Sequence, residues 1–417
     1  MKKLCICLCL LLVLTGCGGI KKGTAEKTGP AITAAPSSPV PTAVPTPAET
    51  AAPATPAERQ VSVAFAPAPT MTPLSTPSPS PVPTFTVGGE TVRADEETLV
   101  LTQKSELELL GYFPSLRQAD CSAFTLDPDT AYRVRTAHPD TRFVFTLEAY
   151  GLTVTDDMTY LDLRGVKIES LNTVDEIAAC MPNLTKVDVR GCGYSNEELG
   201  ALSERHPGIR FVWEVELKGR KLRTDAVGFS TLNPGKYAGE GASESYRQKV
   251  RTAKRLYTAD IQVLRYCPDL IALDLGHNYI DDLSVLEYLP NLQILIVADN
   301  KLTDISPLEK LPNLVYVEFF MNAVTDISPL ADHPLLLDLN FCNNKVTDLS
   351  PLTTMPQLER VWCAGNKFSR ADGKALQEQM PGCIVDYTAK DDTADGWREH
   401  ERYEWMRAYM KGEHNPE

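Results

Sequence analysis

The sequence predicts an α/β solenoid, a stack of short coils that each contribute one strand, preceded by a long disordered linker. Two observations lead to this fold class. Asparagines recur every 22 residues in the second half of the chain, and 15 of the 31 prolines lie between Pro30 and Pro83. The periodic part can bury a continuous core only by stacking its units. The proline-rich part cannot bury a core at all.

The 22-residue unit begins at Leu270, and its copies keep one register. The first two read LIALDLGHNYIDDLSVLEYLPN and LQILIVADNKLTDISPLEKLPN. Alternating apolar residues, such as Leu273 and Leu275, predict a short strand with one face inward. Because buried turns must satisfy their backbone groups, we expect an asparagine at each bend to hydrogen-bond neighbouring coils. The predicted structural ladder consists of Asn278, Asn300, Asn322, Asn344 and Asn366.

The pattern L-x-x-L-x-L-x-x-N at a fixed period is the leucine-rich-repeat signature. Pairs such as Ser306-Pro307 predict a serine cap and a first-turn proline on the far side of each coil. The D-[IL]-S-P-L form of the unit resembles the internalin-like bacterial leucine-rich repeats, over about Asp260 to Phe368. The resemblance implies the architecture and a habit of binding proteins. Unlike the internalins, the sequence shows no L-P-x-T-G sorting motif and no evident Ig-like module after the repeats.

Longer and weaker repeats flank the 22-residue units. Residues 138–144 reappear 68 positions later at 206–212, and prolines 25 residues apart occur in both copies and in the closing unit. We expect these 25-residue-type units to carry helices and to open and close the stack. The predicted order is a duplicated β/α region with a Gly/Ser-rich connecting loop (85–245, the loop from about Gly228 to Ser245), the 22-residue repeats with their closing unit (246–387), and a C-terminal helical cap (388–417).

The first residues are typical of a targeting sequence. Lys2 and Lys3 precede an apolar run too short to span a bilayer. The next residues, Leu-Thr-Gly-Cys at 14–17, resemble the bacterial lipobox. That resemblance implies a lipoprotein signal peptide at 1–16, lipidation of Cys17 and attachment to the membrane. Residues 17–84 then form a disordered Pro/Ala/Thr/Ser-rich stalk. The whole chain resembles leucine-rich-repeat lipoproteins of Gram-positive bacteria, which implies display on the extracytoplasmic face of the membrane.

Several function classes are excluded by composition and spacing. The chain carries 41 Lys and Arg against 55 Asp and Glu, a net charge of −14, which argues against binding nucleic acid. The sequence has no C-x-x-C or H-x₃₋₅-H pair, so we expect no metal site. The histidines do not cluster and the aspartates are periodic, whereas catalysis needs a unique constellation. We expect no cofactor and no enzymatic activity.

Strand positions that point away from the core predict a partner-binding surface on the concave face of the solenoid. Aromatic anchors with charged neighbours are typical of protein-binding surfaces, so a protein of unknown identity is the expected partner. Two alternatives stay open. The Gly/Ser loop or the tail covers this face, or the aromatic row stacks on glycan rings in a structural envelope role. The predicted surface consists of Ile294, Ile296, Tyr316, Glu318, Phe320, Met321 and Trp362.

Overall fold

A computed structural model describes residues 81–231, 255–388, 393 and 396–416 of the chain, all within the compact unit Ser78–Glu417. The predicted signal peptide and Cys17 lie outside the described residues. Nearly all of the predicted stalk and most of the predicted Gly/Ser loop also lie outside them. None of the helices in the described ranges combines the length and the apolarity needed to cross a membrane.

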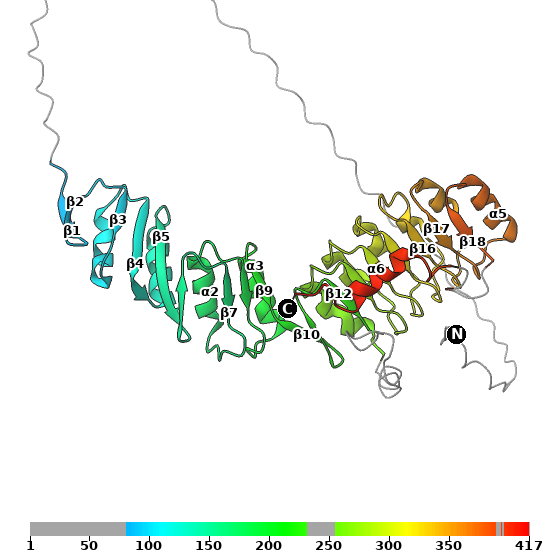
Figure 1. Ribbon diagram of the computed structural model, residues 1–417, viewed down its shortest axis with the longest axis horizontal. Helices are drawn as coiled ribbons and strands as arrows, with labels where there is room; N and C mark the ends of the chain where they lie inside the picture. The colour runs from blue at the N-terminus through cyan, green and yellow to red at the C-terminus, as the bar shows by residue number, and fades with distance from the viewer. Residues whose placement is uncertain (1–80, 232–254, 389–392, 394–395, 417) are drawn as a thin grey trace, which may run out of the picture. The chain divides into compact units, whose positions relative to one another are not determined.

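The repeats form one sheet of seven parallel strands in chain order (Figure 1). Ala272 pairs with Ile294 and Ile294 with Tyr316, so that neighbouring strands repeat at the 22-residue spacing of the sequence. The last step, from Arg360 to Ile384, is two residues longer. The strands are β12 (Gly228–Ser230), β13 (Ala272–Asp274), β14 (Ile294–Ile296), β15 (Tyr316–Glu318), β16 (Asp338–Asn340), β17 (Arg360–Trp362) and β18 (Ile384–Asp386).

Short 3₁₀ helices form the opposite side of the coils, and a longer helix replaces them in the closing unit. The serine that was expected to cap these turns does not do so. In the turn at Ser306, the carboxylate of Asp304 accepts hydrogen bonds from the Ser306 backbone N–H at 2.8 Å and from its hydroxyl at 2.9 Å. The periodic aspartate therefore caps the turn. The helices are η3 (Thr258–Tyr266), η4 (Ser284–Tyr288), η5 (Ser306–Lys310), η6 (Ser328–Leu330), η7 (Ser350–Thr354) and α5 (Arg370–Gln379).

The region before the repeats contains a four-stranded sheet, a three-stranded parallel sheet and two antiparallel hairpins. The four-stranded sheet comprises β3 (Thr98–Val100), β4 (Gln118–Leu126), β5 (Arg142–Ala149) and β6 (Leu152–Thr155). The three-stranded sheet comprises β7 (Tyr160–Asp162), β8 (Lys186–Asp188) and β9 (Arg210–Val212). The hairpins are β1 (Thr84–Val87) with β2 (Glu90–Arg93), and β10 (Glu214–Leu217) with β11 (Arg220–Arg223).

The 68-residue duplication corresponds to a repeated helix–turn–strand. Helices α1 (Pro128–Ala137) and α3 (Asn196–Arg205) start 68 residues apart, and His138 and His206 follow them as C-caps. Each imidazole lies about 6 Å from the phenylalanine of the next strand, which makes the histidines part of the repeat packing. The remaining helices are η1 (Lys104–Tyr112), α2 (Leu171–Cys180) and α6 (Glu401–Met410).

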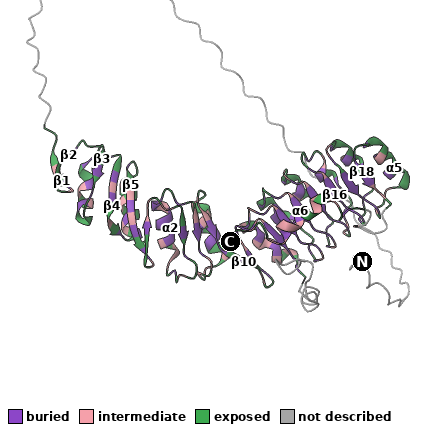
Figure 2. Cartoon of the chain, viewed as in Figure 1, coloured by how far each residue is buried: buried purple, intermediate pink, exposed green. Residues whose placement is uncertain are grey.

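The opening region departs from the predicted stack in two places. Hairpin β10–β11 lies between the three-stranded sheet and β12, so the sheets are separate. The predicted Gly/Ser loop also begins too early, because Gly228 to Ser230 form β12 and pair with β13. Figure 2 shows buried residues in the strands of every described sheet.

The asparagines of the predicted ladder join consecutive coils through side-chain hydrogen bonds. The Asn300 side-chain carbonyl accepts from the Ile280 backbone N–H at 3.0 Å. Its amide donates to the carbonyl oxygens of Leu275 at 2.9 Å and Val297 at 3.1 Å. Asn278, Asn322, Asn344 and Asn366 make equivalent bonds in their own coils. Backbone groups at each bend thus depend on a side chain from the neighbouring coil.

Replacing Asn300 should therefore destabilise the whole solenoid. We expect Asn300→Ala to lower the free energy of unfolding by about 3 kcal/mol, because it leaves several buried backbone groups without hydrogen-bond partners. Urea unfolding of the fragment 78–417 measures this loss. Asn313→Ala serves as the control, since Asn313 is on the surface and donates one hydrogen bond, to the Pro290 carbonyl at 2.8 Å. Equal losses for the two variants would contradict the role of the ladder.

Candidate functional site

The seven-stranded sheet has a different cluster of side chains on each face. The middle residues of the strands, such as Leu295 and Val317, point into the main core of the solenoid. The first and third residues point to the other side, which we call the concave face. With residues just beyond the strands and three from the C-terminal segment, they form a second buried cluster: Ala272, Ile294, Ile296, Ala298, Tyr316, Phe320, Cys342, Trp362, Ala364, Trp397, Met406 and Met410.

The C-terminal segment lies over the concave face. We call residues 396–416, which include α6, the cover (Figure 1). The Trp397 side chain is completely buried, and its ring centroid lies 5.4 Å from Tyr316 and 5.0 Å from Trp362. Met406 and Met410 are buried on the same side of α6. An apolar layer therefore fills the space between the helix and the sheet.

The predicted surface is consequently not open to solvent, which corrects our expectation. Six of its seven residues are buried, and only Met321, at the edge with 45% of its surface exposed, reaches the outside. The sequence places these side chains on the correct face and leaves open that the loop or the tail covers them; the structure shows that the tail does. The tail was expected to cap the end of the stack, and α6 instead contacts β12 and β13. Whether the seven residues bind a partner stays a prediction.

Two buried carboxylates attach the cover to the sheet. The Glu318 carboxylate accepts hydrogen bonds from the Trp397 indole N–H at 2.8 Å and from the Arg398 guanidinium at 2.7 Å. Asp338 accepts from Arg402 at 2.6 Å, and from Arg360 on the next strand at 2.7 Å. Both carboxylates are fully buried. The cations of the cover therefore compensate charges that the cover itself helps to bury.

Burial and charge also shift the acidity of this site. Desolvation alone would lower the pKa of Arg398, but the facing Glu318 carboxylate raises it, so the guanidinium stays charged. Burial, together with the Glu318 charge, raises the pKa of the Tyr316 phenol well above its ordinary value. The Tyr316 hydroxyl donates a hydrogen bond to Glu318. Glu318 is thus the centre of a hydrogen-bonded group that spans the sheet and the cover.

The end of the cover is held at the first strand of the sheet. The Asn415 side-chain carbonyl accepts from the backbone N–H groups of Val227 and Gly228, each at 2.9 Å, and its amide donates to the Gly228 carbonyl at 3.1 Å. A Cβ atom on Gly228 would lie 2.0 Å from the backbone oxygen of Tyr409. Glycine at 228 therefore permits the close approach of α6.

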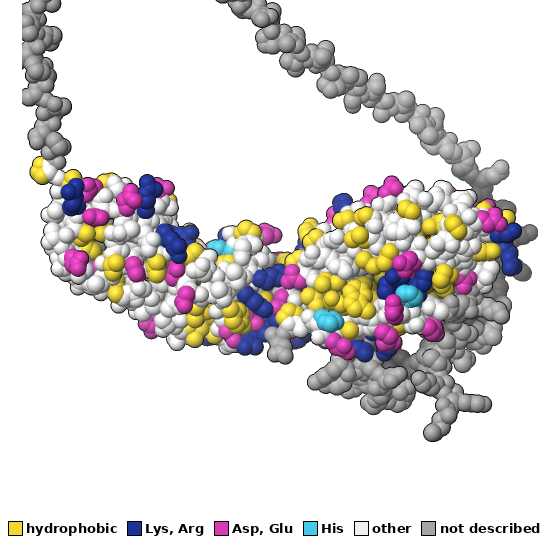
Figure 3. Space-filling model, turned by 45° about the horizontal axis from the view of Figure 1, so that its top comes forward, with side chains coloured by type: hydrophobic (Ala, Val, Ile, Leu, Met, Phe, Trp, Pro, Cys, Tyr) yellow, Lys and Arg dark blue, Asp and Glu magenta, His cyan; other side chains and the backbone are white. Residues whose placement is uncertain are grey.

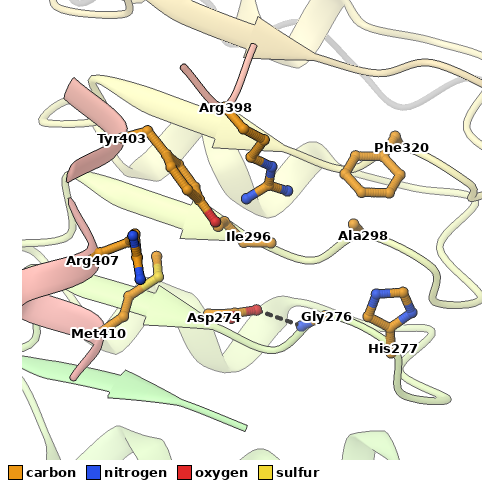
Figure 4. A pocket seen from close by; sticks show the side chains of 10 residues that line it. All are labelled: Asp274, Gly276, His277, Ile296, Ala298, Phe320, Arg398, Tyr403, Arg407 and Met410. Carbon is orange, nitrogen blue, oxygen red and sulfur yellow. Dashed lines mark hydrogen bonds between the residues drawn. The ribbon is translucent and has the colours of Figure 1, made fainter. Parts of the chain in front are cut away.

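A cavity of about 360 Å³ remains between the sheet and the cover (Figure 4). Asp274 lies at its sheet side, while Arg398, Tyr403, Arg407 and Met410 reach it from the cover. The Asp274 carboxylate accepts from the Gly276 N–H at 2.9 Å and from the Ser230 hydroxyl at 2.8 Å. It forms no ion pair with any of the described residues, and burial raises its pKa.

The described residues show no other chemical centre. All seven of their cysteines are thiols, and no group of His, Cys, Asp or Glu among them could hold a metal ion. On the face that Figure 3 shows, basic and acidic side chains are interspersed. The sequence analysis missed Trp397, Arg398 and Arg402 as parts of the site. Their only signal was the helical spacing of Tyr403, Met406 and Met410, which predicts a helix but not its docking place.

One family model matches part of the repeat region. Residues 290–332 match the family model for leucine-rich repeats in two copies. Internalin C2 from Listeria monocytogenes is 21% identical, covering 62% of this chain and 92% of its own, with a TM-score of 0.28. An internalin (inlF) from the same organism is 15% identical, covering 73% of this chain and 87% of its own, with a TM-score of 0.31. No curated protein matches the chain. The 22-residue register of the strands and the family match together identify this part of the chain as leucine-rich repeats.

The unpaired charge of Asp274 predicts a pH-dependent effect on stability. Because its folded pKa is raised above the ordinary 3.8, Asp274 weakens the fold increasingly as the pH rises through the folded pKa. Asp274→Asn should therefore stabilise the protein at pH 7 by about 1 kcal/mol or more, since an unpaired buried charge is costly. Below pH 3.8 both states of the wild type are protonated and the gain should vanish. Urea unfolding at several pH values checks this, and a gain independent of pH would contradict it.

Proposed function

We propose that this chain is a lipid-anchored leucine-rich-repeat protein, displayed on the outer side of a bacterial cell membrane, that binds a protein partner through its concave face. One observation carries the proposal. The concave face already holds a protein segment, the cover, by aromatic packing and buried ion pairs. Buried aromatic and arginine anchors are what protein-binding surfaces use. The likeness of the 22-residue units to internalin-like repeats supports the same class of function, in adhesion, host contact or envelope organisation.

The alternative, a glycan-binding or structural envelope component, has less support. Glycan recognition by stacking needs aromatic faces that a sugar ring can reach. Tyr316 and Trp362 instead pack against the indole of Trp397 and are buried. Glu318 and Asp338 are paired with arginines, which are the side chains that another protein would supply. These contacts favour a protein partner.

Membrane attachment rests on the residues around Cys17. The short apolar run followed by Leu-Thr-Gly-Cys supports lipidation of this cysteine. One acyl chain gives only reversible binding, whereas a cysteine with two or three chains anchors a protein stably. The proline-rich stalk then holds the folded part away from the bilayer, on the order of 40–180 Å depending on how extended it is.

Partner binding can be tested by photo-crosslinking in living cells. A photoreactive amino acid at Met321, on the edge of the concave face, should give adducts that protease digestion destroys. Tyr288 is the matched control, because it is similarly exposed (54%) but lies in η4 on the opposite side of the coils. Equal adducts at both positions would contradict the proposed face. Adducts at 321 that only a cell-wall hydrolase removes would favour the glycan alternative.

The anchor predicts a change of location. Cys17→Ser should release the protein from membranes into the medium, because the thiol that takes the lipid is lost. Immunoblotting of membrane and medium fractions measures the release. Cys9→Ser, which removes a cysteine from the apolar run and leaves the lipobox intact, should stay with the membrane. Unchanged membrane retention of the Cys17 variant would count against lipidation.

A further inference from the structure

The concave face carries an excess of negative charge that the cover neutralises. The first and third residues of β13 to β17 include three carboxylates, Asp274, Glu318 and Asp338, but only one guanidinium, Arg360, a net charge of 1 − 3 = −2. The cover supplies two arginines, which pair with Glu318 and Asp338. Charge complementarity of this kind selects a ligand and sets its register.

The contacts of the cover follow a simple pattern along its sequence. Arg398, Arg402, Met406 and Met410 are spaced four residues apart, and Trp397 precedes the first of them. The two arginines bind the carboxylates, and the two methionines and the indole enter the apolar cluster. Arg402, Met406 and Met410 lie along one side of α6, whereas Trp397 and Arg398 precede its N-cap, His400. The face therefore binds a turn with an aromatic residue and an arginine, followed by a helix with one basic and two apolar positions.

The fit of the cover is incomplete at two points. Asp274 faces the cavity with no cation paired to it among the described residues. One terminal nitrogen of Arg360 is buried and has no hydrogen-bond partner in the described part of the chain. Polar groups left unsatisfied under the cover oppose its binding. Both groups gain water when the cover leaves.

We propose that the cover is a displaceable occupant of the concave face, and that the face binds a basic, aromatic helical segment of a partner protein in its place. This inference rests on the proposed function and names the class of partner. The partner segment carries an aromatic residue, arginines that pair with Glu318 and Asp338, and a further cation that reaches Asp274. A segment with that third cation binds more tightly than the cover.

Opening of the cover does not require unfolding of the solenoid. The main core lies on the other face of the sheet, and the asparagine ladder does not include cover residues. Glu318 and Asp338 become hydrated on opening, so that no charge remains buried without a partner. Segments attached in this way open locally at a fraction of the cost of global unfolding.

Two cysteines report separately on opening and unfolding. Cys342 is buried in the concave-face cluster, which also contains the cover residues Trp397, Met406 and Met410, whereas Cys363 is buried in the main core. Lys345 and Arg360 lie between them, so tryptic peptides separate the two sites. In the full chain under native conditions, an alkylating reagent should modify Cys342 about tenfold or more faster than Cys363, as local opening predicts. Equal rates, as measured by mass spectrometry, would overturn the proposal, because the cover would then leave only on unfolding.

Charge removal from the cover should accelerate its opening. The double variant Arg398→Ala/Arg402→Ala should raise the Cys342 rate by about tenfold or more, because it breaks both ion pairs with the sheet. The rate at Cys363 should not change. The control is Lys411→Ala, which removes a cation that pairs with Glu413 inside the cover itself. Equal acceleration in the control would contradict the role of the sheet carboxylates.

A synthetic peptide tests the chemistry of the partner. A peptide of residues 397–416, added in excess to the Arg398→Ala/Arg402→Ala chain, should slow modification of Cys342, and a scrambled peptide should not. A Met410→Lys version of the peptide should protect at about tenfold lower concentration, because the lysine reaches Asp274. Asp274→Asn in the chain should remove that gain. If the first peptide gives no protection, the face does not bind a segment of this kind. If the lysine gives no gain, a third cation does not pair with Asp274.

These measurements need no natural partner, which keeps them separate from the proposed function. If the cover never opens, this inference is wrong, but the crosslinking test of the proposed function at Met321 is not affected. Conversely, an opening cover without adducts at Met321 would show a displaceable segment in a protein whose concave face has no protein partner.

Discussion

The backbone groups at the bends of the coils impose the constraint on which this structure depends. Each bend turns inside the protein, where its N–H and C=O groups cannot reach water, and an asparagine of the adjoining coil binds them. No coil is complete without its neighbour, and β13 to β15 pair at the 22-residue spacing of the repeats. The same register aligns the first and third residues of successive strands. A continuous surface on the concave face therefore results from the same register that lets each asparagine hydrogen-bond the backbone groups of the neighbouring bend.

On that surface, electrostatics determines what can lie there. Glu318 and Asp338 are buried only because the cover brings arginines to them. Buried ion pairs contribute little net stability, since desolvation of the charges offsets their attraction, but they define one position and register. The apolar contacts of Trp397, Met406 and Met410 supply the attraction. Affinity and specificity thus come from different side chains of the same short segment.

The sequence predicts the part of this arrangement that is periodic. The direction of Leu295 and Val317 into the core, and of Ile294 and Tyr316 away from it, follows from alternation alone. Coverage by the tail was only one of the alternatives left open, because Trp397 meets Glu318 across 79 residues and no local pattern encodes that contact. Glu318 was therefore expected on an exposed surface. The hairpins β5–β6 and β10–β11 did leave a local signal in Tyr150-Gly151 and Lys218-Gly219, whose positive φ values suit two-residue turns.

The contact of Asn415 with Gly228 joins positions 187 residues apart, the beginning of the repeat sheet and nearly the last described residue. A chain that is synthesised from its N-terminus presents the finished sheet before those final residues emerge. Pairings between such distant positions also form slowly, because a long loop must close first. Every newly made molecule therefore passes through an interval in which its repeats are stacked and its concave face is bare. During synthesis, chaperones or neighbouring molecules meet that uncovered apolar surface first.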